Sequence, residues 1–284
     1  MIRMPTDDGF DHTDALARLE AVAGRYRRVL TAYSGGVDST LVAAVARKVL
    51  GRENAPAVIG DSPSLPRAEF AQAKQLAQSL DLQLIVIAPN EQDDPGYQAN
   101  AGDRCYYCKT HLYEQVQAYA VENGYTTIFN GTNADDLGDH RPGLVAADEA
   151  QVVSPLIEAR LDKEAVRFLA QHLKLPNWDK PAAACLASRI PYGTEVTLER
   201  LAQVERAEAA LHALGFVGLR VRHHDQVARI ELPGDQMQQI LDPSVRLKVA
   251  SAVKKTGFLY VSLDLEGFRS GSGNVALTVS GVTT

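Results

Sequence analysis

One stretch of the sequence, VLTAYSGGVDSTLVAAVARKVL at residues 29–50, constrains the fold more than any other. Its first five residues predict a buried strand, and the glycine-containing SGGVDS follows as a tight turn. From near Val37 onward, apolar residues recur at helical spacing, so a helix is expected to follow the turn directly. A strand, a glycine turn and a helix in this order indicate a βαβ unit of a parallel sheet.

The same alternation continues through the first half of the chain, where the loops SGGVDS, GDSPS and GTNADD each follow a predicted strand. The fold class predicted is therefore α/β, a parallel sheet with helices on both faces. Ligands bind at the carboxyl ends of the strands in such sheets, so these loops are expected to form the site. Strands are expected in PAVIG, DLQLIVIAP and YTTIF, and helices at residues 14–28, in RAEFAQAKQLAQSL and from RCYYCK onward.

The pattern changes after about residue 180. LRVRHHDQVARIELPG alternates polar and apolar residues as one half-buried strand does, and helical periodicity precedes and follows it. This segment, with a further strand in FLYVSLDLEGF, predicts a smaller α+β domain. We expect one domain at residues 1–180, a second at 181–272 and a disordered tail at 273–284.

Charge and hydropathy argue against a nucleic-acid-binding protein and against a membrane-spanning protein. The chain has 284 residues and a formal net charge of −6, whereas proteins that bind nucleic acid usually show a basic balance. No nucleic-acid partner is therefore expected. An apolar run of ~18 residues is absent, so no membrane-spanning helix is expected. The first residues have no apolar core of a signal peptide, so a cytoplasmic location is the expectation.

The SGGVDS loop at residues 34–39 has the features of a phosphate site. Glycines allow the backbone to approach an anion, and the helix that follows offers unpaired N–H groups and a partial positive charge. Asp38 is a candidate ligand for a magnesium ion that bridges phosphates. The loop lacks the lysine of G-x-x-x-x-G-K-[ST] and does not match G-x-G-x-x-G. A turn that only packs a helix on a strand would leave its serines and aspartate unexplained.

The chain contains three cysteines, two of them in RCYYCK as the pair Cys105 and Cys108, and the third at Cys185. In a cytoplasmic chain, a C-x-x-C pair more often binds metal or takes part in redox chemistry than serves a structural role. Zinc would need about four ligands, and His111 is a candidate for the fourth. An iron–sulfur cluster held by three thiolates would keep one iron open for an external ligand. Three unconnected cysteines are the remaining alternative.

SGGVDS resembles the pyrophosphate loop of the N-type ATP pyrophosphatases, which include GMP synthetase, NAD synthetase and several tRNA-thiolating enzymes. The resemblance implies cleavage of ATP between its α and β phosphates to form an adenylate. The residues that it implies for pyrophosphate binding are Ser34, Gly35, Gly36, Asp38 and Ser39. Those that it implies near the nucleotide are Ser62, Gly131, Thr132 and Asn133.

RCYYCK, WDKPAAACLASRIPYGTEVT and GTNADDLGDHRPG together resemble the LarE family, from Tyr33 to about Ser272. These ATP-dependent sulfur transferases build the nickel-pincer cofactor of lactate racemase. The resemblance implies an adenylating domain at residues 1–180 and a substrate-binding, sulfur-transfer domain at 181–272. It implies ATP, magnesium, a homohexamer, and pyridinium-3,5-biscarboxylic acid mononucleotide as a substrate that receives sulfur as a thiocarboxylate.

Members of the family supply sulfur in two ways. Some sacrifice the sulfur of one cysteine at the position of Cys185, and others hold a 4Fe–4S cluster with three cysteines. Because this chain has Cys105, Cys108 and Cys185, it resembles the cluster-bearing type. In that type the open iron would carry the sulfide that is transferred. A sacrificial Cys185 remains an alternative.

Arg220 and Arg222 lie two residues apart on a predicted strand, so they point to the same side. Paired guanidiniums suit a phosphate, although an exposed strand face with ordinary charges fits the spacing equally well. The resemblance favours binding of the substrate phosphate, and it adds Ser188 and Arg189. The residues whose roles stay open are Asp135, Asp136, Asp139, His223 and His224.

Three other functions compete with this interpretation. A tRNA-thiolating enzyme should need a broad basic surface, which an acidic chain does not favour. A glutamine-fed synthetase would need a glutaminase nucleophile, and none is recognisable beside the three cysteines. A zinc-stabilised, ATP-binding regulator without turnover is the third alternative.

Overall fold

The computed structural model describes residues 12–138 and 142–269, and its chain forms two compact units. The first unit comprises the described parts of residues 1–61, 67–89 and 109–183. The second comprises those of 62–66, 90–108 and 184–284. The units are thus not two consecutive ranges, because two short segments of the first 180 residues belong to the second unit. The predicted tail at 273–284 lies outside the described residues.

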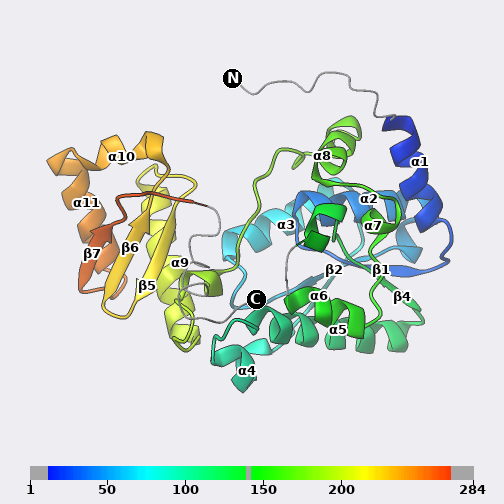
Figure 1. The fold of residues 1–284 in the computed structure, drawn as a ribbon, viewed down its shortest axis with the longest axis horizontal. Coiled ribbons are helices and arrows are strands. Elements are labelled where there is room, and N and C mark those ends of the chain that lie inside the picture. Colours follow the sequence, from blue (N-terminus) through cyan, green and yellow to red (C-terminus); the bar gives the residue numbers. More distant parts are fainter. Residues whose placement is uncertain (1–11, 139–141, 270–284) are drawn as a thin grey trace. The chain divides into compact units, whose positions relative to one another are not determined.

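The first unit contains a four-stranded sheet in the order β3-β2-β1-β4, and all three strand pairs are parallel. Its strands are β1 (Val29–Ala32), β2 (Ala57–Gly60), β3 (Leu84–Ile87) and β4 (Thr127–Phe129). Helices lie on both sides of this sheet, which confirms the α/β prediction (Figure 1). The alternation of buried runs and helical periodicity is the reason that the prediction succeeded.

Two cores hold the helices to the sheet. On one face, α1 (His12–Ala23), α2 (Val37–Leu50), α7 (Pro155–Glu158) and α8 (Lys163–His172) contribute residues to a core that includes Val29 and Phe129. On the other face, α5 (Arg104–Asn123) packs on the strands through residues such as Val116 and Ala120. The remaining helices of the unit are α3 (Arg67–Ser79) and α6 (Pro142–Glu149).

The helix predicted at residues 14–28 is shorter in the structure and ends at Ala23. Gly24 follows, and its N–H donates to the carbonyl of Glu20 at 2.8 Å. The chain then turns and enters β1.

The second unit contains a three-stranded sheet in the order β5-β6-β7. Strand β5 (Arg220–His224) pairs antiparallel with β6 (Val227–Glu231), and β7 (Tyr260–Leu263) pairs parallel with β6. Helices α9 (Leu198–Ala213), α10 (Gly234–Ile240) and α11 (Pro243–Lys254) share a core with this sheet. The prediction of one strand across LRVRHHDQVARIELPG was wrong, because the chain reverses at Asp225, whose φ is 50°. The segment is therefore a hairpin.

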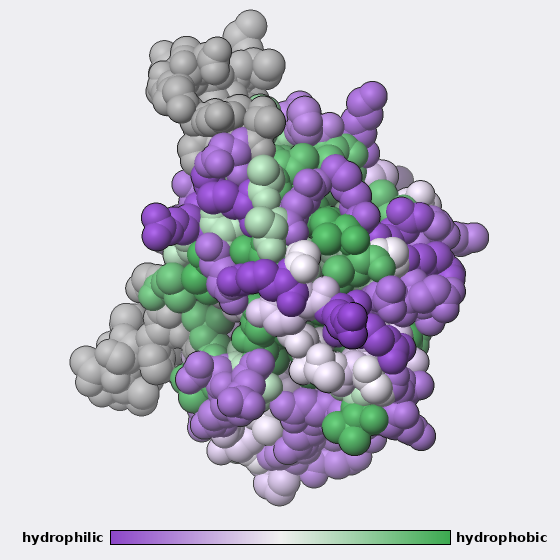
Figure 2. Space-filling model, turned by 90° about the vertical axis from the view of Figure 1, so that its right-hand side faces the viewer, coloured by the Kyte–Doolittle hydropathy of each residue, from purple (hydrophilic) through white to green (hydrophobic). Residues whose placement is uncertain are grey.

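The surface is mainly polar on the face that Figure 2 shows, where hydrophilic side chains predominate and apolar ones gather in separate groups. Within residues 12–138 and 142–269, no helix combines the length and the apolar character that a bilayer span requires. The large, fully buried side chains lie in the cores of the two units and include Phe129, Leu41, Phe216 and Phe258.

Candidate active site

The SGGVDS loop joins β1 to α2 as the sequence predicts. Gly36 is the N-cap residue of α2, so no side chain caps the first N–H groups of this helix. The hydroxyls of Ser34 and Ser39 lie 3.1 Å apart, and Ser39 Oγ also accepts from the backbone N–H of Ser34 at 3.1 Å. The loop therefore closes on itself through its serines and leaves helix N–H groups available to an anion.

Two glycines of the predicted site are required by close packing. Gly35 has a φ of 71°, and a Cβ atom there would lie 2.7 Å from the Cβ of Ala73. A Cβ atom at Gly131 would lie 2.6 Å from the backbone nitrogen of Ser39. The loop after β4 therefore lies directly against the first turn of α2, so the structure brings two predicted loops together.

Replacement of Gly131 with alanine is expected to destabilise the fold by about 1–3 kcal/mol, because the new methyl group would displace the backbone at Ser39. Chemical denaturation of the two proteins measures this difference. Gly234→Ala is the control, because nothing lies within 4 Å of a Cβ at that position. Equal unfolding free energies for Gly131→Ala and the original chain would contradict the prediction.

Asp38 is the centre of a polar cluster in the first unit. Lys163 Nζ lies 2.5 Å from Asp38 Oδ2, and Asn133 Nδ2 donates to Asp38 Oδ1 at 3.1 Å. Lys163 is the first residue of α8, and its backbone N–H donates to Asp135 Oδ2 at 3.0 Å. The fold thus supplies the loop with a lysine that SGGVDS itself lacks. Sequence reasoning missed this residue, which is 125 positions away from Asp38 and in no recognisable motif.

Asn177 is a second residue that sequence reasoning missed. Its side-chain amide is buried and donates to the carbonyl of Gly35 and to Thr40 Oγ1, both at 3.1 Å. These bonds hold the loop through a backbone carbonyl and a hydroxyl, so they add no charge to it. No local pattern marks Asn177 in the sequence.

The loop after β4 is shaped by its own polar groups. Asn130 Oδ1 accepts from the N–H of Thr132 at 3.1 Å, and Asp136 Oδ2 accepts from the N–H of Asn133 at 3.1 Å. Asp135 and Asp136 thus organise backbone in this structure. Asp139 lies outside the described residues.

Ser62 belongs to the second unit, where its hydroxyl donates to Glu91, a carboxylate that is 1% exposed. Ser62 Oγ also accepts from the N–H of Ser64 at 3.0 Å. The expected contact of Ser62 with a nucleotide stays a prediction.

The three cysteines all belong to the second unit. Cys105 and Cys108 are the second and fifth residues of α5, and Cys185 precedes the short 3₁₀ helix η4 (Leu186–Arg189). Cys105 and Cys185 are exposed, and Cys108 is partly buried. Access of a ligand or reagent to the sulfur atoms is therefore open.

Two buried groups, Arg104 and Tyr97, are each influenced by Cys185 and by one cysteine of the pair. Burial lowers the pKa of Arg104, but the thiolates of Cys185 and Cys105 raise it, and the net pKa lies above its ordinary value. Burial is the main cause that raises the pKa of Tyr97, and Cys185 and Cys108 add to the rise. Cys185 and the C-x-x-C pair thus act on neighbouring groups of the second unit.

Thiolates are suitable ligands for an iron–sulfur cluster or zinc, but the described residues contain no group of three or more His, Cys, Asp or Glu side chains arranged to hold a metal ion. The chemistry of the three thiols fits an iron–sulfur cluster. His111, the candidate fourth zinc ligand, has its Nδ1 3.7 Å from Glu114 Oε2.

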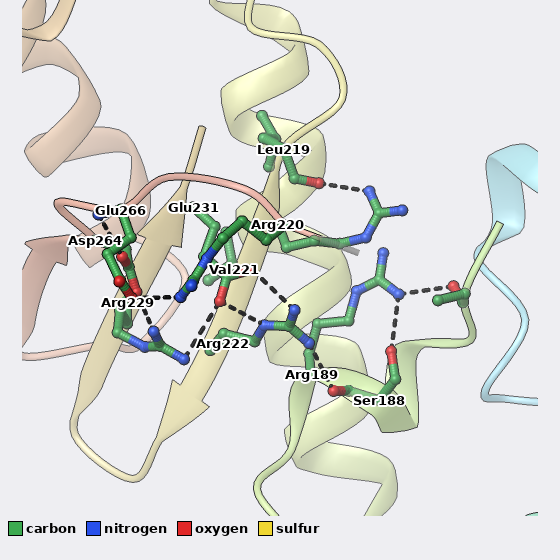
Figure 3. A network of polar contacts seen from close by, with 12 residues as sticks. Ser188, Arg189, Leu219, Arg220, Val221, Arg222, Arg229, Glu231, Asp264 and Glu266 are labelled. Atoms are coloured by element: carbon green, nitrogen blue, oxygen red, sulfur yellow. Dashed lines mark hydrogen bonds and ion pairs between the residues drawn. The ribbon is translucent and has the colours of Figure 1, made fainter. Parts of the chain in front are cut away.

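An arginine cluster lies beside η4 in the second unit (Figure 3). Arg222 makes two bonds to the buried Glu231, at 3.0 and 2.8 Å, and a third to the carbonyl of Ser188 at 2.8 Å. Arg189 pairs with Glu208 at 3.0 and 3.2 Å. It also donates to the backbone carbonyls of Ala184 and Cys185 and to the hydroxyl of Ser188. The cluster is thereby tied to the backbone around Cys185.

Arg220 differs from the other two arginines. Its guanidinium donates to the carbonyl of Leu219 at 2.7 Å and lies over the ring of Phe268, but no carboxylate of the described residues pairs with it. Burial, followed by the positive charge of Arg189, lowers the pKa of Arg220. The cluster therefore carries a positive charge that could attract an anion.

The two histidines on β5 occupy different environments. His223 is buried, and its Nε2 lies 3.1 Å from Gln203 Oε1. Burial, with a smaller contribution from Arg200, lowers its pKa. His224 Nε2 accepts from Arg229 Nε at 3.2 Å, and burial, then Arg229, lowers its pKa. Both side chains therefore favour the neutral form.

Comparisons with known proteins place the chain among its relatives. The family model for NAD synthase matches residues 19–98, which include the SGGVDS loop. A Synechocystis sp. protein is 46% identical over 93% of this chain and 98% of its own length. The pyridinium-3,5-bisthiocarboxylic acid mononucleotide synthase of Lactiplantibacillus plantarum is 41% identical over 94% of this chain and 96% of its own length. The NH(3)-dependent NAD(+) synthetase of Helicobacter hepaticus is 36% identical over 58% of this chain and 65% of its own length.

Because the similarity to the L. plantarum synthase extends over nearly the whole of both chains, this protein belongs to the LarE family of ATP-using sulfur transferases.

Proposed function

We propose that the chain adenylates a carboxylate of pyridinium-3,5-biscarboxylic acid mononucleotide with ATP and then replaces it by a thiocarboxylate. The observation that carries this proposal is the near full-length similarity to a synthase of the bisthiocarboxylic product. The Asp38–Lys163 cluster beside the SGGVDS loop supports the ATP half of the reaction. The three thiols in the second unit support the sulfur half.

In the first half-reaction, a substrate carboxylate oxygen attacks the α-phosphorus of ATP and pyrophosphate leaves. The N–H groups at the start of α2 are suited to bind that pyrophosphate, and Asp38 is suited to hold its magnesium ion. Lys163, which lies beside Asp38, would neutralise the charge that develops on the leaving group. Positioning and charge neutralisation are the work expected of the protein here.

In the second half-reaction, a sulfur nucleophile attacks the acyl carbon, AMP leaves and a thiocarboxylate remains. Cys105, Cys108 and Cys185 would hold a 4Fe–4S cluster, which when bound supplies sulfide at an iron without a cysteine ligand. Arg220, with Ser188, Arg189 and Arg222, would bind the phosphate of the substrate. The alternative in which Cys185 gives up its own sulfur uses the same adenylate.

We extend the proposal to a cytoplasmic location, where reduced thiols persist, and to a homo-oligomer, with a hexamer as the specific expectation. A tRNA substrate is disfavoured by the net charge of −6.

The experiment that tests the proposal is turnover by anaerobically purified protein with ATP, magnesium and the mononucleotide. Pyrophosphate and AMP should appear only when the mononucleotide is present, and mass spectrometry should show oxygen exchanged for sulfur in it. A parallel reaction receives tRNA instead. Pyrophosphate release that depends on tRNA, or on neither addition, would overturn the proposal.

Replacement of Arg220 with methionine is expected to raise the KM for the mononucleotide about 10-fold to 150-fold with little change in kcat. One charge-assisted hydrogen bond to phosphate contributes about 1.5–3 kcal/mol to binding. Arg220 forms no ion pair with a carboxylate of the described residues, so the substitution leaves no carboxylate without its partner. Steady-state kinetics of pyrophosphate release measure this effect. Arg246→Met, on the exposed side of α11, is the control, and an unchanged KM for Arg220→Met would contradict the role.

A further inference from the structure

Asn100 occupies the centre of a set of buried bonds that connects two segments far apart in the chain. Its side chain is fully buried, and its Nδ2 donates to the carbonyls of Ile190, Pro191 and Thr194 at 3.3, 2.8 and 2.8 Å. The backbone carbonyl of Asn100 accepts a hydrogen bond from the N–H of Gly193 at 3.0 Å. One residue just before the cysteine pair thus holds the backbone that follows Cys185.

Arg104 strengthens the same connection from the first residue of α5. It is 4% exposed, and its Nη1 donates to Asn100 Oδ1 and, at 3.0 Å, to the carbonyl of Ala187. Its guanidinium also lies over the ring of Tyr192. Arg104 immediately precedes Cys105, and Ala187 lies two residues after Cys185. The bond to Ala187 therefore joins the two cysteine-bearing segments almost at the cysteines themselves.

Arg104 also carries a charge that the described residues do not neutralise with a carboxylate. A buried guanidinium without a negative partner is unfavourable, and a neutral side chain could make the same two hydrogen bonds without this cost. The retained charge is suited to a neighbour that becomes negative. Thiolates that bind together in one ligand set are such a neighbour.

We propose that Asn100 and Arg104 form a clamp of positioning residues that fixes the Cys185 segment beside the Cys105–Cys108 turn, so that three thiols from distant segments act as one site. This inference rests on the proposed function, in which the three thiols act together. The clamp needs no ATP, substrate or metal, because all of its bonds are within the second unit.

The test measures the proximity of thiols in the full-length, reduced and metal-free chain with a short bifunctional thiol reagent. Peptide mass spectrometry quantifies Cys185 joined to Cys105 or Cys108, relative to Cys105 joined to Cys108. The second product lies within one helical turn, so it is an internal reference. Unlike turnover, this readout uses neither ATP nor the mononucleotide. The clamp can therefore fail the test while the proposed function stands, and the proposed function can fail while the clamp is confirmed.

Asn100→Gly is the main variant, because Asn100 has a φ of 52° that glycine adopts without strain. The relative yield of Cys185 products should fall about tenfold, since the effective concentration of one thiol near another depends on such constraints. Asn90→Gly is the matched control: Asn90 is in the same unit, has a φ of 61°, is exposed and makes no capping bond with its side chain. Its product ratio should equal that of the original chain.

Arg104→Gln and Arg104→Lys keep the test decisive if Asn100→Gly does not fold, as judged by circular dichroism. Glutamine should lower the ratio, whereas lysine, which keeps the charge and can still donate hydrogen bonds, should preserve part of it. The proposal is overturned if the original chain gives no Cys185 product. It is also overturned if folded Asn100→Gly or Arg104→Gln leaves the ratio unchanged, or if Asn90→Gly lowers it equally.

Discussion

The Cys185→Ser protein is expected to lose sulfur transfer by at least about 1,000-fold while it still releases pyrophosphate in the presence of the mononucleotide. A hydroxyl has nearly the shape of a thiol but can neither bind iron as a thiolate does nor donate sulfur. Cys185 is exposed, so the substitution should leave the fold intact. Product mass and pyrophosphate, measured in the same reaction, separate the two half-reactions.

A Cys105→Ser protein distinguishes the two sources of sulfur. If three thiols hold a cluster, this protein should lose transfer as fully as Cys185→Ser does. If Cys185 sacrifices its sulfur, Cys105→Ser should complete one turnover, and the mass of the Cys185 peptide should fall by one hydrogen sulfide. Full sulfur transfer by Cys185→Ser would contradict both mechanisms.

The Lys163→Met protein is expected to release pyrophosphate about 100-fold to 1,000-fold more slowly than the original chain. Lys163 forms an ion pair with Asp38 of the SGGVDS loop. Loss of one group that stabilises the charge developing in a transition state typically slows a reaction by this factor. Single-turnover measurements with saturating ATP and magnesium isolate this step. The stability of the protein should change little, because both partners of the ion pair remain partly exposed.

Lys48→Met is a matched control for this prediction. Lys48 is also paired with a carboxylate of the first unit, Glu20, at 2.6 Å. It lies in the last turn of α2, at the end of the helix opposite to the SGGVDS loop. A normal rate in Lys163→Met, or an equally slow rate in Lys48→Met, would exclude a specific role of Lys163 at the pyrophosphate.

Local signals were sufficient to predict the parallel sheet and the loop between β1 and α2. Buried strands, helical periodicity and glycine turns depend on residues that are close in sequence. The same reasoning placed one strand where the structure has a hairpin, because alternation continues through His224 and Val227 and does not reveal the reversal at Asp225. A single non-glycine residue with positive φ leaves little trace in a sequence pattern.

The site was predicted less completely than the fold. The serines, glycines and aspartate of the loop and the three cysteines are recognisable by type and spacing. Lys163, Asn177 and the glutamates that pair with Arg189 and Arg222 are not, because their partners are determined by tertiary packing. The spacing of Arg220 and Arg222 likewise does not reveal that a buried carboxylate already holds one of them.

The interleaved composition of the second unit has a consequence for synthesis of the protein on the ribosome. Residues 62–66 and 90–108 emerge early, but the unit cannot be completed until residues 184–269 have followed. Domains usually fold as they emerge, so Cys105 and Cys108 are made well before the segment that pairs with them. The three cysteines of the second unit are therefore together only in the finished chain. A fragment that begins at residue 184 would keep Cys185 but lose both other cysteines, so the long C-terminal segment of the second unit carries only one of the three thiols.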